Sequence, residues 1–106
     1  MRYKSYHEAV KLIKEKLPLK YPVSVRRVTT PQSIHGDCWF DKEKKHFVIR
    51  IDRKLSQFWA VDVFAHEFGH ALSWEASKKE DHGDAWGMAY ALVYRTLLEH
   101  WFKKIQ

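Results

Sequence analysis

The segment His66-Glu67-Phe68-Gly69-His70 lies inside the longest apolar-periodic run of the chain, and the rest of the sequence is organised around it. On a helix, residues four positions apart share a face, so the two imidazoles of this HExxH pattern can bind one metal ion. Glu67 follows His66 by about 100° round the helix axis and can reach a water molecule beside that ion. The pattern therefore predicts a metal centre on a helix.

Apolar residues around the motif recur at the spacing of one helical face. That face comprises Val61, Phe64, Ala65, Phe68 and Leu72. The two histidines fall on the opposite side, where Trp59, Val63 and Trp74 are expected to form buried flanks. We therefore expect a helix over residues 56–75, with Ser56 as its N-terminal cap.

The other elements also follow from periodicity and turn residues. A polar turn at 41–45 separates the last two expected strands, which should form an antiparallel hairpin with Phe47, Ile49 and Ile51 on one face. Gly69 costs the central helix about 1 kcal/mol relative to alanine, so another segment should pack close to its backbone. The first expected element is a helix over Tyr6–Leu17, capped by Ser5 and stopped by Pro18. Strands are expected at Val23–Arg26, Ile34–Phe40 and His46–Ile51. A closing helix is expected from His82 to Lys104, capped by Asp81, and its buried face comprises Trp86, Ala89, Tyr90, Val93, Leu97 and Trp101.

The order of these elements indicates an α+β fold, and a length of 106 residues indicates one domain over residues 1–106. A hydrophobic content of 45% is enough for a substantial core. Cys38 is the single cysteine, so no internal disulfide can form; we expect it to be a small core residue. The absence of an apolar leader and of any long apolar run favours a cytoplasmic protein with no membrane partner. The net charge of +6 fits an anionic partner, but the basic residues are dispersed, so we expect only weak, non-specific nucleic-acid contact.

A catalytic zinc site usually takes three protein ligands, and the motif supplies two. A short connection after the central helix can fold the closing helix back and bring His82 toward the metal. If that helix begins at His82, Asp84 lies about 160° round the axis from the Trp86 stripe and faces away, where it can hydrogen-bond to His82. A later start would free Asp84 to turn inward. The competing carboxylates are Glu80, Asp81, Asp84 and Glu99.

The sequence resembles the SprT-like family of zinc metallopeptidases over about residues 34–90. The residues that carry the resemblance are His66-Glu67-Phe68-Gly69-His70-Ala71, Asp81-His82-Gly83 and Trp86, preceded by Phe47-Val48-Ile49-Arg50-Ile51 and Leu55. The resemblance implies a zincin-like core, in which a small three-stranded sheet with an antiparallel hairpin packs on the motif helix and a closing helix follows.

By the same resemblance, Zn²⁺ is bound by His66, His70 and His82, and Glu67 is the general base of an endopeptidase. The strand beside the motif helix would hold a protein or peptide substrate in extended form. Many relatives carry a cysteine-rich zinc ribbon and DNA-binding segments, which this chain lacks, so a DNA-repair role is not implied.

Two other interpretations stay open. The chain can be a non-catalytic zinc-containing module that engages nucleic acid or protein through its basic surface, or a metallopeptidase of another clan with a carboxylate as third ligand. Glu67 favours an enzyme, because a structural zinc site needs no base.

Several further side chains are expected to be surface or packing residues. His35 and His46 would line the cleft if the hairpin borders the site, and Tyr90 or Tyr94 could offer a hydroxyl to an oxyanion. This group comprises His7, His35, His46, His100, Tyr90 and Tyr94.

Overall fold

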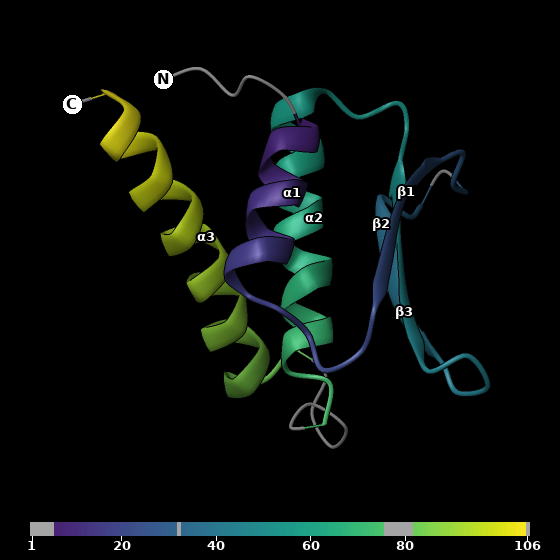
Figure 1. Cartoon of the computed structure of the whole chain (residues 1–106). Coiled ribbons are helices and arrows are strands. Elements are labelled where there is room, and N and C mark those ends of the chain that lie inside the picture. Colours follow the sequence, from purple (N-terminus) through teal and green to yellow (C-terminus); the bar gives the residue numbers. More distant parts are fainter. Residues whose placement is uncertain (1–5, 32, 76–81, 106) are drawn as a thin grey trace.

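The computed structural model describes residues 6–31, 33–75 and 82–105, with side chains as far as residue 100. These residues form an α+β fold of three helices and a three-stranded mixed sheet. In Figure 1, α2 stands between the sheet and α3, and α1 contacts both α2 and α3. The elements are α1 (Tyr6–Lys16), β1 (Val23–Val28), β2 (Gly36–Asp41), β3 (His46–Asp52), α2 (Gln57–Leu72) and α3 (Asp84–Ile105).

The sheet has the strand order β1-β3-β2, so the last strand in sequence is the central one. β2 and β3 pair antiparallel with Cys38 opposite Ile49, which confirms the predicted hairpin. β1 pairs with β3 in parallel, with Val25 opposite the same Ile49. This parallel pairing was not predicted. It leaves β2 at an edge of the sheet, beside α2.

The helix α2 starts where the sequence predicts. Ser56 caps it, and its hydroxyl accepts a hydrogen bond from the backbone N–H of Trp59 at 3.3 Å. The predicted C-terminal end was wrong by three residues, because the helix ends at Leu72 rather than residue 75. The Ser73 hydroxyl donates to the carbonyl oxygen of Gly69 at 2.8 Å, a side-chain bond that competes with further helical turns.

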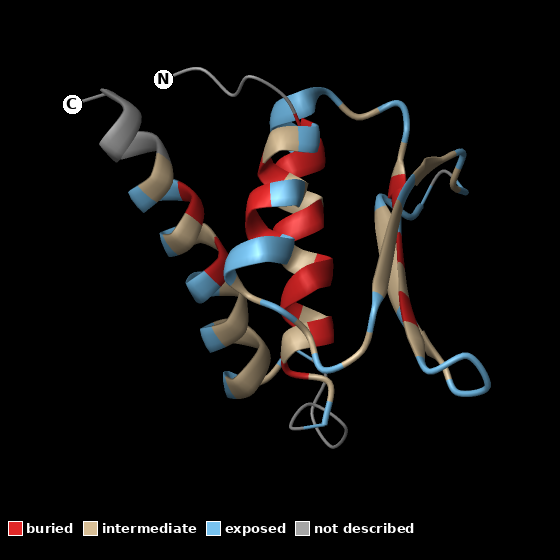
Figure 2. Ribbon diagram, in the orientation of Figure 1, coloured by how far each residue is buried: buried red, intermediate tan, exposed pale blue. Residues whose placement is uncertain are grey.

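The core lies where α2 meets the sheet and the other two helices (Figure 2). The predicted apolar face of α2 is buried, apart from half-buried Leu72, and so is the predicted face of β3. The other side of α2 is more open than predicted, because Trp59 is 56% exposed. The side chains that are at most 1% exposed are Ala9, Ile13, Ile49, Ile51, Ala60, Val61, Phe64, Ala65, Phe68, Val93 and Leu97.

Helix boundaries elsewhere differ slightly from expectation. α1 ends at Lys16, one residue before the predicted end and two before Pro18. α3 begins at Asp84 rather than at His82, and buries Val93 and Leu97 as predicted. The predicted caps Ser5 and Asp81 and the side chain of Trp101 lie outside the described residues. No helix in the described ranges is both long and apolar enough to span a bilayer.

Candidate metal centre

Three imidazoles converge where α2 meets the turn before α3. His66 and His70 lie four residues apart on α2, and His82 approaches them from that turn. The Nε2 atom of His82 lies 3.0 Å from Nε2 of His70 and 3.2 Å from Nε2 of His66. A tetrahedral metal with metal–nitrogen bonds of about 2.0–2.1 Å would hold its ligand nitrogens about 3.3 Å apart. The three residues are therefore close enough to bind one metal ion.

The chemistry of the donor set also fits a cation. A neutral imidazole that carries its proton on Nδ1 presents the lone pair of Nε2 as an acceptor. In that tautomer the Nε2 lone pairs of His66, His70 and His82 point into one small space and repel one another. A metal ion at their centre would turn this repulsion into three coordinate bonds.

His82 reaches the centre from a left-handed backbone conformation, with φ of 59°. It therefore lies outside α3, whereas the sequence predicts it at the start of a helix. For a residue with a Cβ atom this conformation costs about 1–2 kcal/mol. The contact between the rings of His82 and Trp86, whose centroids are 4.7 Å apart, can offset part of that cost.

Trp86 is the residue at this centre whose role the sequence did not reveal. Its ring contacts all three histidine rings, with centroid distances of 4.9 Å to His66, 5.6 Å to His70 and 4.7 Å to His82. Its indole N–H donates to the carbonyl oxygen of His66 at 3.1 Å. The other neighbour in the stack is Tyr90, at 5.1 Å. The sequence placed Trp86 in an apolar stripe and in the family resemblance but indicated no role for it at the site. The available signal was its N–H, since a half-buried indole usually finds an acceptor.

The close approach predicted at Gly69 is confirmed. A Cβ atom at Gly69 would lie 3.2 Å from the backbone nitrogen of Tyr90 and 3.3 Å from Nε1 of Trp86. The missing side chain therefore lets α3 rest against α2 at the level of the histidines.

Glu67 is only 7% exposed and lies on the sheet side of the centre. Its Oε2 atom is 3.8 Å from Nε2 of His66, so a carboxylate borders the space into which the imidazoles point.

Burial, assisted by the charges of Glu67 and Asp37, raises the pKa of the Cys38 thiol to about 12. Cys38 is thus a half-buried neutral thiol beside Glu67, somewhat less enclosed than the core residue predicted.

None of the competing carboxylates that the structure describes joins the three histidines. Asp84 is exposed at the first position of α3 and is not part of the described cluster. Glu99 pairs instead with Arg95 at 3.5 Å, near the other end of α3. Glu80 and Asp81 lie outside the described residues.

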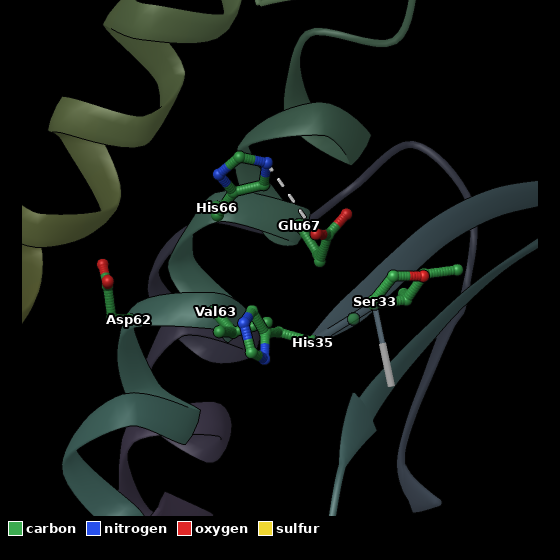
Figure 3. Close-up of a pocket in the computed structure, with 8 residues that line it drawn as sticks. Ser33, His35, Asp62, Val63, His66 and Glu67 are labelled. Atoms are coloured by element: carbon green, nitrogen blue, oxygen red, sulfur yellow. Dashed lines mark ion pairs between the residues drawn. The ribbon is translucent and has the colours of Figure 1, made fainter. Parts of the chain in front are cut away.

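A pocket of about 350 Å³ opens beside the centre (Figure 3). His35 is exposed, as expected of a surface residue, and it also lines the pocket, which was the alternative for a hairpin that borders the site. His46 is not: its Nε2 lies 2.6 Å from the Ser24 hydroxyl in the sheet. The pocket is lined by Ser33, Ile34, His35, Gly36, Asp62, Val63, His66 and Glu67.

The hydroxyl groups of Tyr90 and Tyr94 both donate to Oδ1 of Asp62, at 2.5 Å for Tyr90. Burial, together with this bond, raises the pKa of Tyr90 to about 12 and shifts that of Tyr94 still higher. Because both hydroxyls are engaged with Asp62, they tie α3 to α2, and neither is presented to an oxyanion in this arrangement.

Comparison of the chain with protein families, with characterised proteins and with solved structures finds no match.

Proposed function

We propose that the chain is a zinc-dependent endopeptidase with a zincin-like core of the SprT-like type. The observation that carries the proposal is the convergence of three imidazoles beside a buried carboxylate, with His66 and Glu67 lining an open pocket. Three protein ligands leave the fourth position of a tetrahedral ion for water or substrate, which is the arrangement of catalytic zinc.

In this proposal His66, His70 and His82 hold the zinc, which when bound acidifies water and polarises a carbonyl group. Glu67 accepts a proton from the attacking water and delivers it to the nitrogen of the leaving amine. Its position suits this role, because its Oε2 atom lies 3.8 Å from Nε2 of His66 and it lines the pocket. The aromatic ring of Trp86 keeps the imidazoles in place.

The position of β2 supports an extended peptide as the substrate. β2 is an edge strand, so its outer backbone groups can pair with an added strand. The start of β2 lies close to α2, because its first residue is a glycine. A Cβ atom at Gly36 would lie 2.7 Å from Cγ1 of Val63 on α2 and 2.8 Å from the carbonyl oxygen of Arg50 on β3. A peptide paired with β2 would therefore run past the pocket that contains His66 and Glu67.

Substitution of Glu67 by glutamine tests the proposal. Glu67→Gln removes the base and no ligand, so it should retain one zinc per chain while hydrolysis of an unfolded substrate such as casein falls at least about a hundredfold. Glu99→Gln makes the same chemical change at an exposed position and should leave hydrolysis unchanged. Zinc is measured by elemental analysis and hydrolysis by release of labelled peptides, each with and without a chelator.

Equal cleavage by the parent and by Glu67→Gln would contradict the role of Glu67. Stable zinc without any hydrolysis in the parent would instead favour a non-catalytic zinc module. Absence of zinc in protein purified without added metal, and of any thermal stabilisation on adding it, would remove the basis of both.

A further inference from the structure

The pocket beside the metal centre is negatively charged in a basic protein. The chain has 19 Lys and Arg residues against 13 Asp and Glu, for a net charge of +6. The residues that line the pocket nevertheless include two carboxylates, Asp62 and Glu67, and neither Lys nor Arg. Figure 3 shows these two carboxylates on opposite sides of His66. Glu67 has an assigned role as the base, whereas Asp62 has none in the proposed chemistry.

Asp62 is held in place by two tyrosine hydroxyl groups. Tyr90 and Tyr94 donate to the same oxygen, Oδ1, so the carboxylate is oriented by two hydroxyl groups that carry no charge. Among the described residues, no basic side chain forms an ion pair with Asp62. Its second oxygen, Oδ2, can therefore accept a hydrogen bond from a ligand. A fixed carboxylate with a remaining acceptor is suited to binding a cation.

The surroundings of Asp62 also suit the hydrocarbon part of a basic residue. Trp59 lies one turn before Asp62 on α2, is 56% exposed, and has its ring centroid 6.4 Å from that of His35, which lines the pocket. Val63 and Ile34 supply apolar wall. Lysine and arginine bury their methylene stems on such surfaces, and an indole face attracts their charged ends.

We propose that this pocket binds a positively charged nitrogen group of the substrate, with Asp62 as its counter-ion. The group is the side chain of a lysine or arginine, or a free α-amino group. Asp62 precedes His66 by four residues, about 6 Å along the helix, so the charged residue would lie next to the bond that is cleaved. The inference rests on the proposed function for its substrate, but binding can be measured without catalysis.

The kinetic test uses one peptide series that the parent protein cleaves. Each position flanking the cleaved bond carries in turn lysine, arginine, norleucine or glutamate, and every peptide is made with a free and with an acetylated N-terminus. One charge-assisted hydrogen bond is worth about tenfold in kcat/KM or more. If the charge comes from a side chain, kcat/KM with lysine or arginine at one position should exceed that with norleucine by at least about this factor. If it comes from the α-amino group, kcat/KM of the free peptide should exceed that of the acetylated one by the same factor.

Two variants separate the charge of Asp62 from its structural role. Asp62→Asn keeps an oxygen that can accept from the tyrosines but removes the charge, so the preference for a cation should fall to about onefold. Tyr94→Phe removes one of the two hydroxyls and keeps the charge, and should retain the preference. Equal loss in both variants would show that Asp62 acts only by joining α2 to α3, which overturns the inference.

A binding measurement separates this inference from the proposed function. The zinc-loaded Glu67→Gln protein cannot use its base, and Asp62 remains as the one carboxylate lining its pocket. Fluorescence anisotropy with the labelled lysine and norleucine peptides should show at least about tenfold tighter binding of lysine, abolished by adding Asp62→Asn. That result without hydrolysis by the parent keeps the inference and rejects the peptidase. If the parent hydrolyses the peptides but neither rates nor binding distinguish lysine from norleucine, the peptidase is kept and the inference is rejected. If no peptide binds at all, the inference is rejected as well.

Discussion

Two glycines in helices of this fold form a matched pair that tests how tightly α3 lies against the metal centre. Gly69 is inside α2 and Gly87 is inside α3. Replacing either by alanine should gain about 1 kcal/mol of helix propensity. A Cβ atom at Gly87 meets nothing within 4 Å, whereas one at Gly69 meets backbone atoms of Tyr90 at 3.2 and 3.3 Å and Nε1 of Trp86 at 3.3 Å.

Gly87→Ala should therefore stabilise the protein, whereas Gly69→Ala should not. Gly87→Ala should raise the free energy of unfolding by about 1 kcal/mol, equivalent to roughly 4–8 °C in Tm for a domain of this size. At Gly69 the same gain is opposed by overpacking, which typically costs about 1–3 kcal/mol. Two of the three contacted atoms belong to the backbone of Tyr90, so relief requires α3 itself to shift slightly away from α2. Gly69→Ala should be neutral to about 2 kcal/mol less stable than the parent.

The displacement of α3 should also appear in metal binding, because α3 carries Trp86 and the turn that bears His82. We expect Gly69→Ala to weaken zinc binding about tenfold, in the range found for residues that orient ligands, and Gly87→Ala to leave it unchanged. Urea unfolding of the metal-free proteins and competition with a chromogenic chelator measure the two effects. If Gly69→Ala proves as stable as Gly87→Ala and binds zinc as tightly as the parent, the close packing of the two helices is refuted.

Four further predictions follow from single side chains. His82→Ala should weaken zinc binding at least about a hundredfold and Asp84→Ala should not; isothermal titration showing the reverse would reassign the third ligand. Trp86→Phe keeps a ring but loses the N–H bond to α2, and should lower zinc affinity by about tenfold in chelator competition, while an unchanged affinity would reduce Trp86 to packing. The pKa of Tyr90 is raised to about 12 in the folded protein, against 10 ordinarily, so the unfolded chain loses this proton first. Stability that is complete below pH 10 should therefore fall between pH 10 and 12, and less steeply in Tyr90→Phe. The thiol of Cys38, with its pKa near 12, should react with iodoacetamide at pH 8 far more slowly in the native protein than in urea.

The parts of the fold that the sequence predicts are those encoded in local periodicity. The apolar stripe of α2 and the alternation of β3 each describe a single element that buries one face, and both are confirmed by burial. The parallel pairing of β1 with β3 has no such signal. Strand order depends on which backbones meet across the sheet, and the pattern of each strand is compatible with either neighbour.

The site divides in the same way. The positions of His66, Glu67 and His70 follow from their spacing on one helix. The tie from Asp62 to Tyr90 and Tyr94 joins residues 28 and 32 positions apart, and a lone aspartate on a helix normally indicates a solvated face. The sequence does not indicate this contact, because no local pattern in either helix encodes a partner in the other.

His82 shows which part of the sequence argument was robust. Its predicted position on a helical face was wrong, because α3 begins at Asp84 and His82 has a left-handed backbone. The prediction that it approaches the other two histidines is confirmed, for a topological reason. His70 lies in the last turn of α2, and α3 runs back along α2 (Figure 1), so residues just before α3 must fall near His70 whatever their conformation. The same topology brings Asp84 to this region. The turn before α3 directs the His82 ring toward the other two histidines and leaves the Asp84 side chain exposed. The approach of His82 to the other two histidines is therefore set by one backbone conformation rather than by helix phase.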